Sequence, residues 1–448
     1  MGHTMLAIIG EVSRNRRRDN VADSLLQRHR AVLPTWISLY YDEPIQIERG
    51  EGRYVFDADG RRYLDFFGGI LTTMVGHAVP EVVDAIAEQA GRIIHSSTLY
   101  LIEPMVELAE RLAAQSGIPD AKVFFTTSGT EANDAALLLA SSYRRSNQVI
   151  AIKNSYHGRS FTQISVTGNR NWSPSSFSPL AVSWLQGGSR LRGPLAGLTD
   201  AEYLARGKAD LEDVLMTTTS GDVAAIIAEP IQGVGGFCLP PDGYFGELQK
   251  ILAPHGILYI SDEVQTGFGR TGEHFWGYEA QGVQPDMITF AKGVGNGMAL
   301  AGVIARGEIM DSLGASSIST FGGSPVAATA GVATFDYLLR HQLQHNALER
   351  GAELRQGLEE AAATNPSIGE IRGKGLMLGV EFVEGPNMDP APKLANEALE
   401  HAKRRGLLIG KGGLFGNVLR IAPPLSVTQE EMGEAIAIFK EVLGGAQV

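Results

Sequence analysis

The chain has 448 residues, of which 44% are hydrophobic and 20% charged, and 38 lysines and arginines against 50 aspartates and glutamates give a formal net charge of −12. This length excludes a small disulfide scaffold and a short binding module, and it predicts more than one domain with a large buried core. The negative balance has the wrong sign for binding a phosphate backbone or an anionic membrane surface, so we expect neither nucleic acid nor a membrane as partner.

The single cysteine, Cys238, cannot form an internal disulfide. This fits a reducing compartment, and we expect a cytoplasmic protein. At the N-terminus the apolar stretch Met5–Ile9 precedes an arginine-rich stretch at 14–18, the reverse order of a secretory signal. We interpret the basic stretch as a solvated leading segment, with a transit-like role as the alternative.

In chain order, helical periodicity alternates with short β-branched runs, the pattern of an α/β protein with a parallel sheet. An early hairpin is predicted over Tyr54–Phe66, with Asp59-Gly60 at its turn. Amphipathic helices are predicted over Val79–Ala90 and Pro104–Gln115. Buried strands are then predicted at Lys122–Thr126, Gln148–Lys153, Val223–Ala228, Ile257–Ser261 and Met287–Ala291.

Residues 168–210 are rich in Ser, Gly and Pro and are interpreted as an insertion loop. The C-terminal part is predicted to hold long helices and Gly-rich strands: Ala327–Arg340, Leu348–Thr364, Met377–Phe382 and Val418–Ile421. We therefore expect an N-terminal segment 1–75 that contributes to a small domain, a large domain 76–325 and a C-terminal small domain 326–448.

Reactive residues follow two of the predicted strands. Asp262 comes directly after Ile257–Ser261, and Lys292 directly after Met287–Ala291. Ligands of open α/β sheets bind at the carboxyl ends of the strands. An acid and a lysine there suit pyridoxal phosphate, because the carboxylate keeps the pyridine nitrogen protonated and the amine forms a Schiff base. Either residue alone is more often a solvated strand end.

Two further segments favour the cofactor. The small-residue turn Ser128-Gly129-Thr130 lies between a strand and a helix, and backbone N–H groups at a helix start bind phosphate. Alone, this turn would be interpreted as an ordinary helix cap. Tyr156 follows the next strand and offers a flat ring that could cover one face of a planar cofactor.

In this order of motifs the chain resembles the class III, fold-type I pyridoxal-phosphate aminotransferases, from about Pro44 to its end. It is most similar to the alanine–glyoxylate aminotransferase 2 and β-alanine–pyruvate group through segments 63–70, 229–234 and 274–277. The resemblance implies a large domain with a mostly parallel central sheet flanked by helices. It also implies a smaller α+β domain built from both chain ends.

The resemblance also implies residue roles. Lys292 holds the cofactor and Asp262 pairs with its ring nitrogen. The other implied contacts are Gln265 at the phenolic oxygen, Tyr156 on the ring face, and Ser128, Gly129 and Thr130 at the phosphate. Thr320 is implied to reach the phosphate of the other subunit, so we expect a homodimer or a dimer of dimers with intersubunit active sites.

Arg420 matches the family arginine that binds a substrate carboxylate, for which a guanidinium fork is well shaped. In the 4-aminobutyrate, ornithine and acetylornithine branches, a glutamate that can neutralise this arginine typically follows Glu-Pro-Ile/Val-Gln-Gly, whereas this chain has Val234. We therefore expect a small monocarboxylate acceptor, pyruvate or glyoxylate, rather than 2-oxoglutarate. Ile70 and Phe67 are candidates for the walls of the substrate pocket, with core packing as the alternative.

The sequence thus predicts a ping-pong transaminase acting on small amino and oxo acids, with an ω-amino acid such as β-alanine, or alanine, as donor. The alternatives are a 4-aminobutyrate or diamine transaminase that uses 2-oxoglutarate, a decarboxylase or aminomutase on the same cofactor site, and a cofactor-binding regulator without turnover. Two Gly-rich segments, 369–375 and 406–412, depart from the spacing of a nucleotide loop. His341 and His345 have no evident third ligand in the sequence, so no metal site is predicted.

Overall fold

The computed structural model describes residues 24–444, in two compact units that meet in the sequence at Gln46 and Ile47. In the first unit, helix α2 (Leu25–Val32) starts with a capping box in which Ser24 and Gln27 satisfy each other's backbone N–H groups. The arginine-rich stretch at 14–18 lies outside the described residues. None of the described helices is long and apolar enough to cross a membrane.

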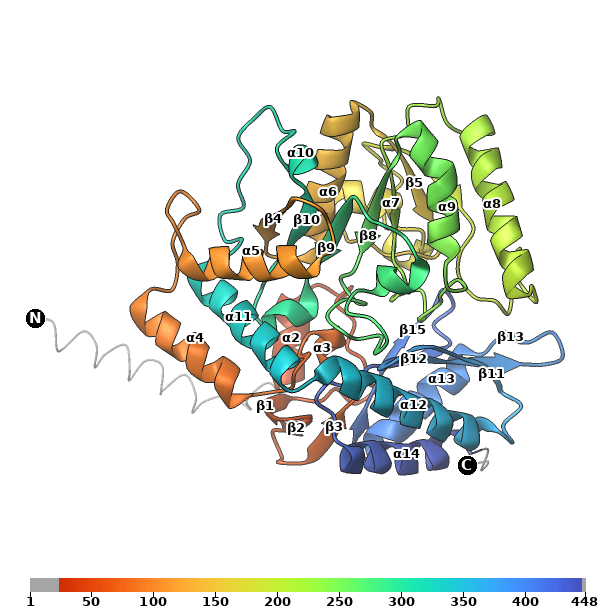
Figure 1. Ribbon diagram of the computed structural model, residues 1–448. Helices are drawn as coiled ribbons and strands as arrows, with labels where there is room; N and C mark the ends of the chain where they lie inside the picture. Colours follow the sequence, from red (N-terminus) through yellow and green to blue (C-terminus); the bar gives the residue numbers. More distant parts are fainter. Residues whose placement is uncertain (1–23, 445–448) are drawn as a thin grey trace, which may run out of the picture. The chain divides into compact units, whose positions relative to one another are not determined.

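The second unit contains a seven-stranded sheet with the strand order β4–β10–β9–β8–β7–β5–β6 (Figure 1). All neighbours from β9 to β6 are parallel, while β10 runs antiparallel to both β9 and β4. This mostly parallel sheet confirms the predicted fold class. The strands are β4 (Ala121–Thr126), β5 (Gln148–Ile152), β6 (Ala181–Leu185), β7 (Ala225–Ala228), β8 (Leu258–Asp262), β9 (Met287–Phe290) and β10 (Ala301–Arg306).

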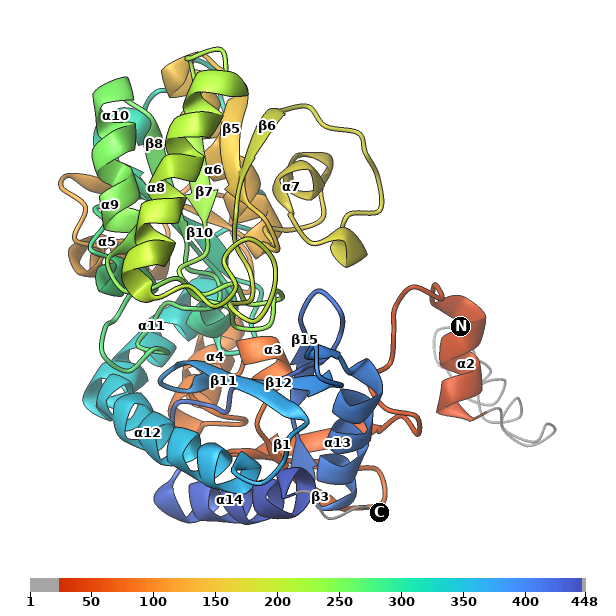
Figure 2. The same cartoon turned by 90° about the vertical axis from the view of Figure 1, so that its right-hand side faces the viewer.

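Every residue of β5, β7, β8 and β9 is buried. Strands buried on both faces have no solvent side, which is why their sequences are mostly apolar rather than alternating. Helix α6 (Gly129–Arg144) packs on this sheet, and α8 (Asp200–Thr217) and α9 (Tyr244–Leu252) lie side by side in both views (Figures 1 and 2). The other helices are α4 (Pro80–Arg92), α5 (Glu103–Gln115), α7 (Phe161–Val166), α10 (Gly307–Met310), α11 (Pro325–Arg340), α12 (Leu343–Ala362), α13 (Pro392–Arg404) and α14 (Gln429–Leu443).

Two smaller sheets follow the orders β1–β2–β3–β14 and β11–β12–β16–β15. The predicted hairpin is confirmed by the antiparallel pairing of β2 and β3, and β14 from the C-terminal part pairs in parallel with β3. Because the residues from Ile47 onward cluster as one unit, the division at 75 and 325 stays a prediction. The strands are β1 (Ile47–Glu51), β2 (Tyr54–Asp57), β3 (Arg62–Asp65), β11 (Ile368–Lys374), β12 (Met377–Glu384), β13 (Asp389–Pro390), β14 (Leu407–Leu408), β15 (Gly410–Gly412) and β16 (Val418–Ile421).

The prediction of a loop over 168–210 is wrong in two places. Strand β6 lies within this segment and extends the large sheet beside β5, and α8 begins at Asp200. The Ser, Gly and Pro residues on both sides of the five-residue strand masked its apolar pattern. The helix start did carry a signal, because Thr199 and Glu202 form a capping box.

Residues Gly68–Leu71 (α3) form a short turn with left-handed backbone. Their φ angles are 54°, 58°, 67° and 61° in order, and the N–H of Leu71 donates to the carbonyl of Phe67 at 2.8 Å. This conformation costs about 1–2 kcal/mol for each residue that has a Cβ, because the Cβ approaches a carbonyl oxygen. Gly68 and Gly69 reduce that cost, whereas Ile70 and Leu71 bear it.

We expect Gly69→Ala to lower the melting temperature and Gly433→Ala, on an exposed face of α14, to raise it. A Cβ at Gly69 would meet only Thr72 at 4.0 Å, and one at Gly433 would meet nothing within 4 Å, so both changes act through the backbone. The free energy of unfolding should fall by about 1 kcal/mol for Gly69→Ala and rise by about 0.5–1 kcal/mol for Gly433→Ala. Thermal unfolding of the two variants beside the parent checks this, and shifts of the same sign would contradict it.

Candidate active site

A cavity of about 330 Å³ lies where β4, β5, β7, β8 and β9 end. Its lining residues follow these strands one after another, because the carboxyl ends of parallel strands share one edge of the sheet. The cavity brings together most of the predicted site residues: Ser128, Gly129, Thr130, Tyr156, Asp262, Gln265 and Lys292.

The first turn of helix α6 forms one side of the cavity. Ser128 caps the helix by accepting the N–H of Glu131 at 3.3 Å. Glu131 accepts the N–H and hydroxyl of Thr127, both at 2.9 Å, and the hydroxyl of Ser319 at 2.7 Å. Burial alone would raise the pKa of Glu131, but these hydrogen bonds lower it. The helix start, with its positive dipole end and backbone N–H groups, is an arrangement that binds anions.

Asp262 is 4% exposed and is held by three groups. Its Oδ2 accepts the side-chain amide of Asn133 at 2.8 Å and lies 2.7 Å from Nδ1 of His157, while Oδ1 accepts the N–H of Val264 at 3.2 Å. Asn133 also donates to the backbone carbonyl of His157 at 2.9 Å. The carboxylate is therefore fixed in orientation at the end of β8.

Lys292 follows β9 in a left-handed conformation with φ 51°. Non-glycine residues rarely adopt this conformation, and it occurs mostly where the surroundings impose it, functional sites included. Burial lowers the pKa of Lys292 to about 8, with Arg420 adding to the effect and the charges of Asp262 and Glu229 opposing it. The amine is thus partly neutral near physiological pH.

Tyr156 and Glu229 meet at another side of the cavity. The backbone N–H of Tyr156 donates to Glu229 at 2.9 Å, and the Tyr156 ring packs edge to face against Trp172 with centroids 5.3 Å apart. Burial raises the pKa of Glu229 to about 7, with the charge of His157 opposing the rise. The backbone of Tyr156 is therefore held by Glu229, and its ring is held by Trp172.

Arg420, on β16, is joined to the cavity through Gln265. Its Nη2 donates to Oε1 of Gln265 at 2.8 Å, and its guanidinium carbon lies 5.4 Å from the ring centre of Phe67 and 4.8 Å from that of Phe237. The structure thus brings Phe67 and Arg420 together beside the cavity. Two predicted residues, Ile70 and Thr320, are exposed and lie outside the cavity lining of this chain.

The family model for class III aminotransferases matches residues 39–443. The chain belongs to this family. It is 39% identical over 414 residues to the mitochondrial alanine–glyoxylate aminotransferase 2 homolog 2 of Arabidopsis thaliana, covering 92% of this chain and 85% of that protein. It is 36% identical over 430 residues to an alanine/serine racemase of Pyrococcus horikoshii, covering 94% of this chain and 90% of that protein.

Among solved structures, a thermostable (S)-enantioselective ω-transaminase from Thermomicrobium roseum is similar, with a TM-score of 0.84 and 34% identity over 95% of this chain and 96% of that one. The predicted family and enzyme class are therefore confirmed. This class III aminotransferase acts on amino and oxo acids and uses pyridoxal phosphate.

The residues at the cavity fit pyridoxal phosphate. The start of α6 suits its phosphate, the fixed carboxylate of Asp262 suits a protonated ring nitrogen, and the amine of Lys292 suits its aldehyde. A Cβ at Gly158, where φ is 138°, would lie 2.6 Å from Oγ1 of Thr130. A glycine at this position therefore allows the chain to pass close to the first turn of the helix.

We expect the amine of Lys292 in the cofactor-free aminotransferase to react as a group with a pKa near 8. At pH 8 about half of it is neutral, whereas an ordinary lysine with a pKa of about 10.4 is neutral to well under 1%. Trinitrophenylation followed by peptide mapping should show the Lys292 peptide modified with a midpoint near pH 8, rising with pH. A midpoint above 10 would contradict the prediction.

The sequence alone predicts no role for Asn133, His157 or Glu229. Signals for them were present: Asn133 lies one helical turn after Gly129, His157 follows Tyr156, and Glu229 follows β7 as Asp262 ends β8. The sequence does not show that these residues lie together, because Asn133 and His157 are each more than 100 residues from Asp262, which they contact.

Proposed function

We propose that this aminotransferase moves an amino group from an ω-amino acid such as β-alanine, or from alanine, to pyruvate or glyoxylate. The observation that carries the proposal is Val234 beside Arg420. The carbonyl of Val234 accepts the N–H of Gly413 at 3.0 Å. A Cβ at Gly412 would lie 3.1 Å from that carbonyl and 2.6 Å from Cδ of Arg420. The uncharged side chain of Val234 cannot pair with the guanidinium, as a glutamate there could.

In the proposed reaction, Nζ of Lys292 removes a proton from the amine-bearing carbon of the substrate as general base, and as general acid it gives a proton to the cofactor carbon that would receive the amino group. When bound, pyridoxal phosphate supplies the sink for the electron pair released at that carbon. Asp262 keeps the ring nitrogen protonated, and Asn133 and His157 hold its carboxylate in place.

The remaining cofactor contacts are proposed as follows. Ser128, Gly129 and Thr130 bind the phosphate, and Tyr156 covers one face of the ring. An amide has both a donor and an acceptor, so Gln265 can donate from Nε2 to the phenolic oxygen while its Oε1 accepts from Arg420. This places the carboxylate-binding arginine one side chain away from the cofactor.

For the substrate pocket we propose Arg420 as the carboxylate anchor, Phe67 as the wall beside it, and Ile70 as part of the rim. Arg420 and Phe67 are supported by their contact, whereas Ile70 rests on its place in the left-handed turn.

The acceptor preference is tested by single-turnover reaction of enzyme loaded with pyridoxamine phosphate. Pyruvate or glyoxylate should react faster than 2-oxoglutarate, and the reverse order would overturn the proposal in favour of the 4-aminobutyrate type. Chiral analysis of alanine that has been incubated with the enzyme but without an oxo acid would detect racemisation, the activity in the name of the Pyrococcus relative. Release of carbon dioxide would indicate decarboxylation.

We further propose a homodimer, alone or paired into a dimer of dimers, in which Thr320 completes the partner's phosphate site. Thr320 is exposed, and its neighbours Ile318 and Phe321 are 60% and 63% exposed, as expected of a surface that a partner covers. Mixing inactive Lys292→Ala subunits with weakened Thr320→Ala subunits should restore activity if the sites are shared. No restoration in a confirmed mixed dimer would contradict shared sites.

The proposed location is cytoplasmic, supported by the single, buried Cys238. The name of the Arabidopsis relative places that protein in mitochondria. Fractionation of cells that express the full chain with a C-terminal tag distinguishes the two.

A further inference from the structure

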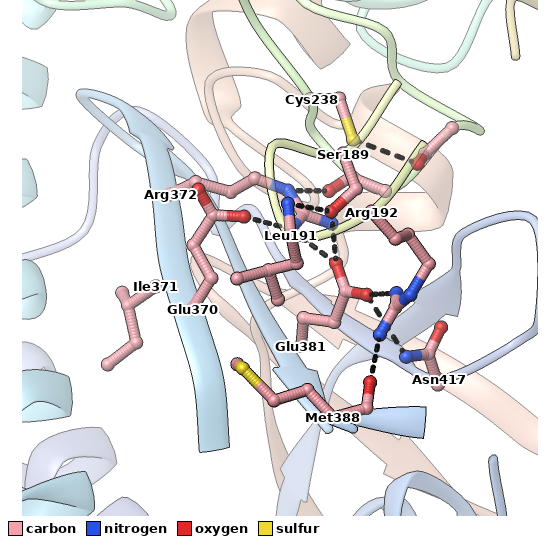
Figure 3. A network of polar contacts seen from close by, with 12 residues as sticks. Ser189, Leu191, Arg192, Cys238, Glu370, Ile371, Arg372, Glu381, Met388 and Asn417 are labelled. Carbon is pink, nitrogen blue, oxygen red and sulfur yellow. Dashed lines mark hydrogen bonds and ion pairs between the residues drawn. The ribbon is translucent and has the colours of Figure 1, made fainter. Parts of the chain in front are cut away.

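A buried ion-pair network lies beside the small sheet that carries Arg420 (Figure 3). Arg372 on β11 is 6% exposed and Glu381 on β12 is 2% exposed, and Nη1 of Arg372 lies 2.5 Å from Oε2 of Glu381. The same nitrogen lies 2.6 Å from Glu370, and Arg192 pairs with the other oxygen of Glu381. Two arginines thus face two glutamates, and the charges balance.

Glu381 is held in its charged form. Burial alone would raise its pKa, but the charges of Arg372 and Arg192 outweigh burial and lower it. Ser189 and Asn417 donate to its two oxygens at 3.3 and 3.2 Å. A buried ion pair of this kind often stabilises a fold no more than apolar residues of the same size would. The other contact of Arg372, with a backbone carbonyl, is therefore more relevant to its role.

Arg372 also fastens a loop that starts at the cavity. Its Nε–H donates to the carbonyl of Gly236 at 2.9 Å. Three residues earlier in the same loop, the N–H of Gly233 donates to Glu229 at 2.8 Å, and Glu229 lines the cavity. The loop is therefore fixed at one end by the cavity and at the other by Arg372.

The register of the small sheet places this contact next to Arg420. Arg372 pairs with Gly379, and Gly379 pairs with Arg420, across three neighbouring strands. Directly opposed residues face the same side of a sheet, so the two arginines flank Gly379. A Cβ at Gly379 would lie 3.0 Å from the Gly236 carbonyl and 3.5 Å from Cβ of Phe237. The loop thus rests on the sheet where a side chain is missing.

Phe237 connects the loop to the proposed carboxylate anchor. It is fully buried, its φ is 56°, and its ring centre lies 4.8 Å from the guanidinium carbon of Arg420. A positive φ is unfavourable for a bulky residue and persists only when its surroundings impose it. The bond from Arg372 to the carbonyl just before Phe237 is one such restraint.

We propose that Arg372, backed by Glu381, is a positioning residue that holds Phe237 against Arg420 and so sets how tightly a substrate carboxylate is bound. This inference rests on the proposed role of Arg420. It differs from a purely structural role because carboxylate binding, and not cofactor binding, should depend on Arg372.

Arg372→Lys tests the proposal, since lysine keeps a charge facing Glu381 but loses the planar fork and the Nε donor. The holoenzyme is titrated with propionate, a carboxylate without an amine, and the absorbance of the bound cofactor is followed. We expect the dissociation constant to rise about tenfold, because a misplacement of about 1 Å can cost about 100-fold and the displacement of Arg420 should be smaller than that. The control is Arg355→Lys, since Arg355 also donates to carbonyls of β11, at Ile371 and Gly373. It should stay within about twofold of the parent.

Gly379→Ala is the second variant and decides the question if Arg372→Lys does not fold. It leaves both arginines in place but displaces the loop, so it should also weaken propionate binding while cofactor affinity is retained. If Arg420→Lys weakens propionate binding but Arg372→Lys and Gly379→Ala leave it unchanged, the positioning role of Arg372 is wrong while the proposed role of Arg420 stands. If Arg420→Lys itself leaves propionate binding unchanged, the proposed carboxylate anchor falls too.

Discussion

Lys292→Ala should reduce turnover by at least about 10⁴-fold, because in the proposed reaction one amine serves as both covalent anchor and proton carrier. The absorbance change on adding an amine donor should also disappear. Stopped assays with alanine and pyruvate, together with absorbance spectra, provide the measurement. The control is Lys153→Ala, an exposed lysine that follows β5 at the same edge of the sheet and should leave turnover unchanged.

The same variant separates loss of chemistry from loss of fold. Because folding lowers the pKa of Lys292 to about 8, its ammonium form, which is still the main form at pH 7, is less stable in the folded chain than in the unfolded chain. Removing it should therefore leave the melting temperature of the cofactor-free protein equal or higher, while Asp262 keeps its bonds to Asn133 and His157. A Lys292→Ala protein that still turned over would refute the assignment of the catalytic amine.

The reactive strand ends were predictable because they depend on local patterns. The apolar runs of β8 and β9 end where Asp262 and Lys292 stand, and parallel strands present such ends along one edge. The small-residue turn before α6 was predictable for the same reason, since the residues that cap the helix are close together in the sequence.

Features that depend on distant contacts were not predictable. The bond between Arg420 and Gln265 spans 155 residues, and neither sequence neighbourhood indicates the other. The left-handed turn at Gly68–Leu71 contradicts the local preference of Ile70, so tertiary context must impose it. The position of Thr320 at a partner's site would depend on a second chain, which no pattern within one chain can place.

Arg420→Lys should lower kcat/KM by about 10- to 100-fold for donors that carry a carboxylate, such as alanine and β-alanine. The guanidinium is held by Gln265 at 2.8 Å and packs near the rings of Phe67 and Phe237. In its proposed role the guanidinium offers two parallel N–H groups to the substrate carboxylate. Lysine offers a point charge on a flexible stem, and losing one charge-assisted hydrogen bond costs about 1.5–3 kcal/mol.

A donor without a carboxylate separates this role from general damage. With 1-phenylethylamine in the single-turnover half-reaction, Arg420→Lys should stay within about twofold of the parent, since no carboxylate is there to be lost. Arg49→Lys serves as the matched control, because the Arg49 guanidinium also lies over a phenyl ring, that of Phe56, but on strand β1. Equal losses with both kinds of donor would show that Arg420 supports the cavity rather than the carboxylate. Loss of activity only with donors that carry a carboxylate would show that substrate selectivity depends on Arg420, which β16 places against Gln265.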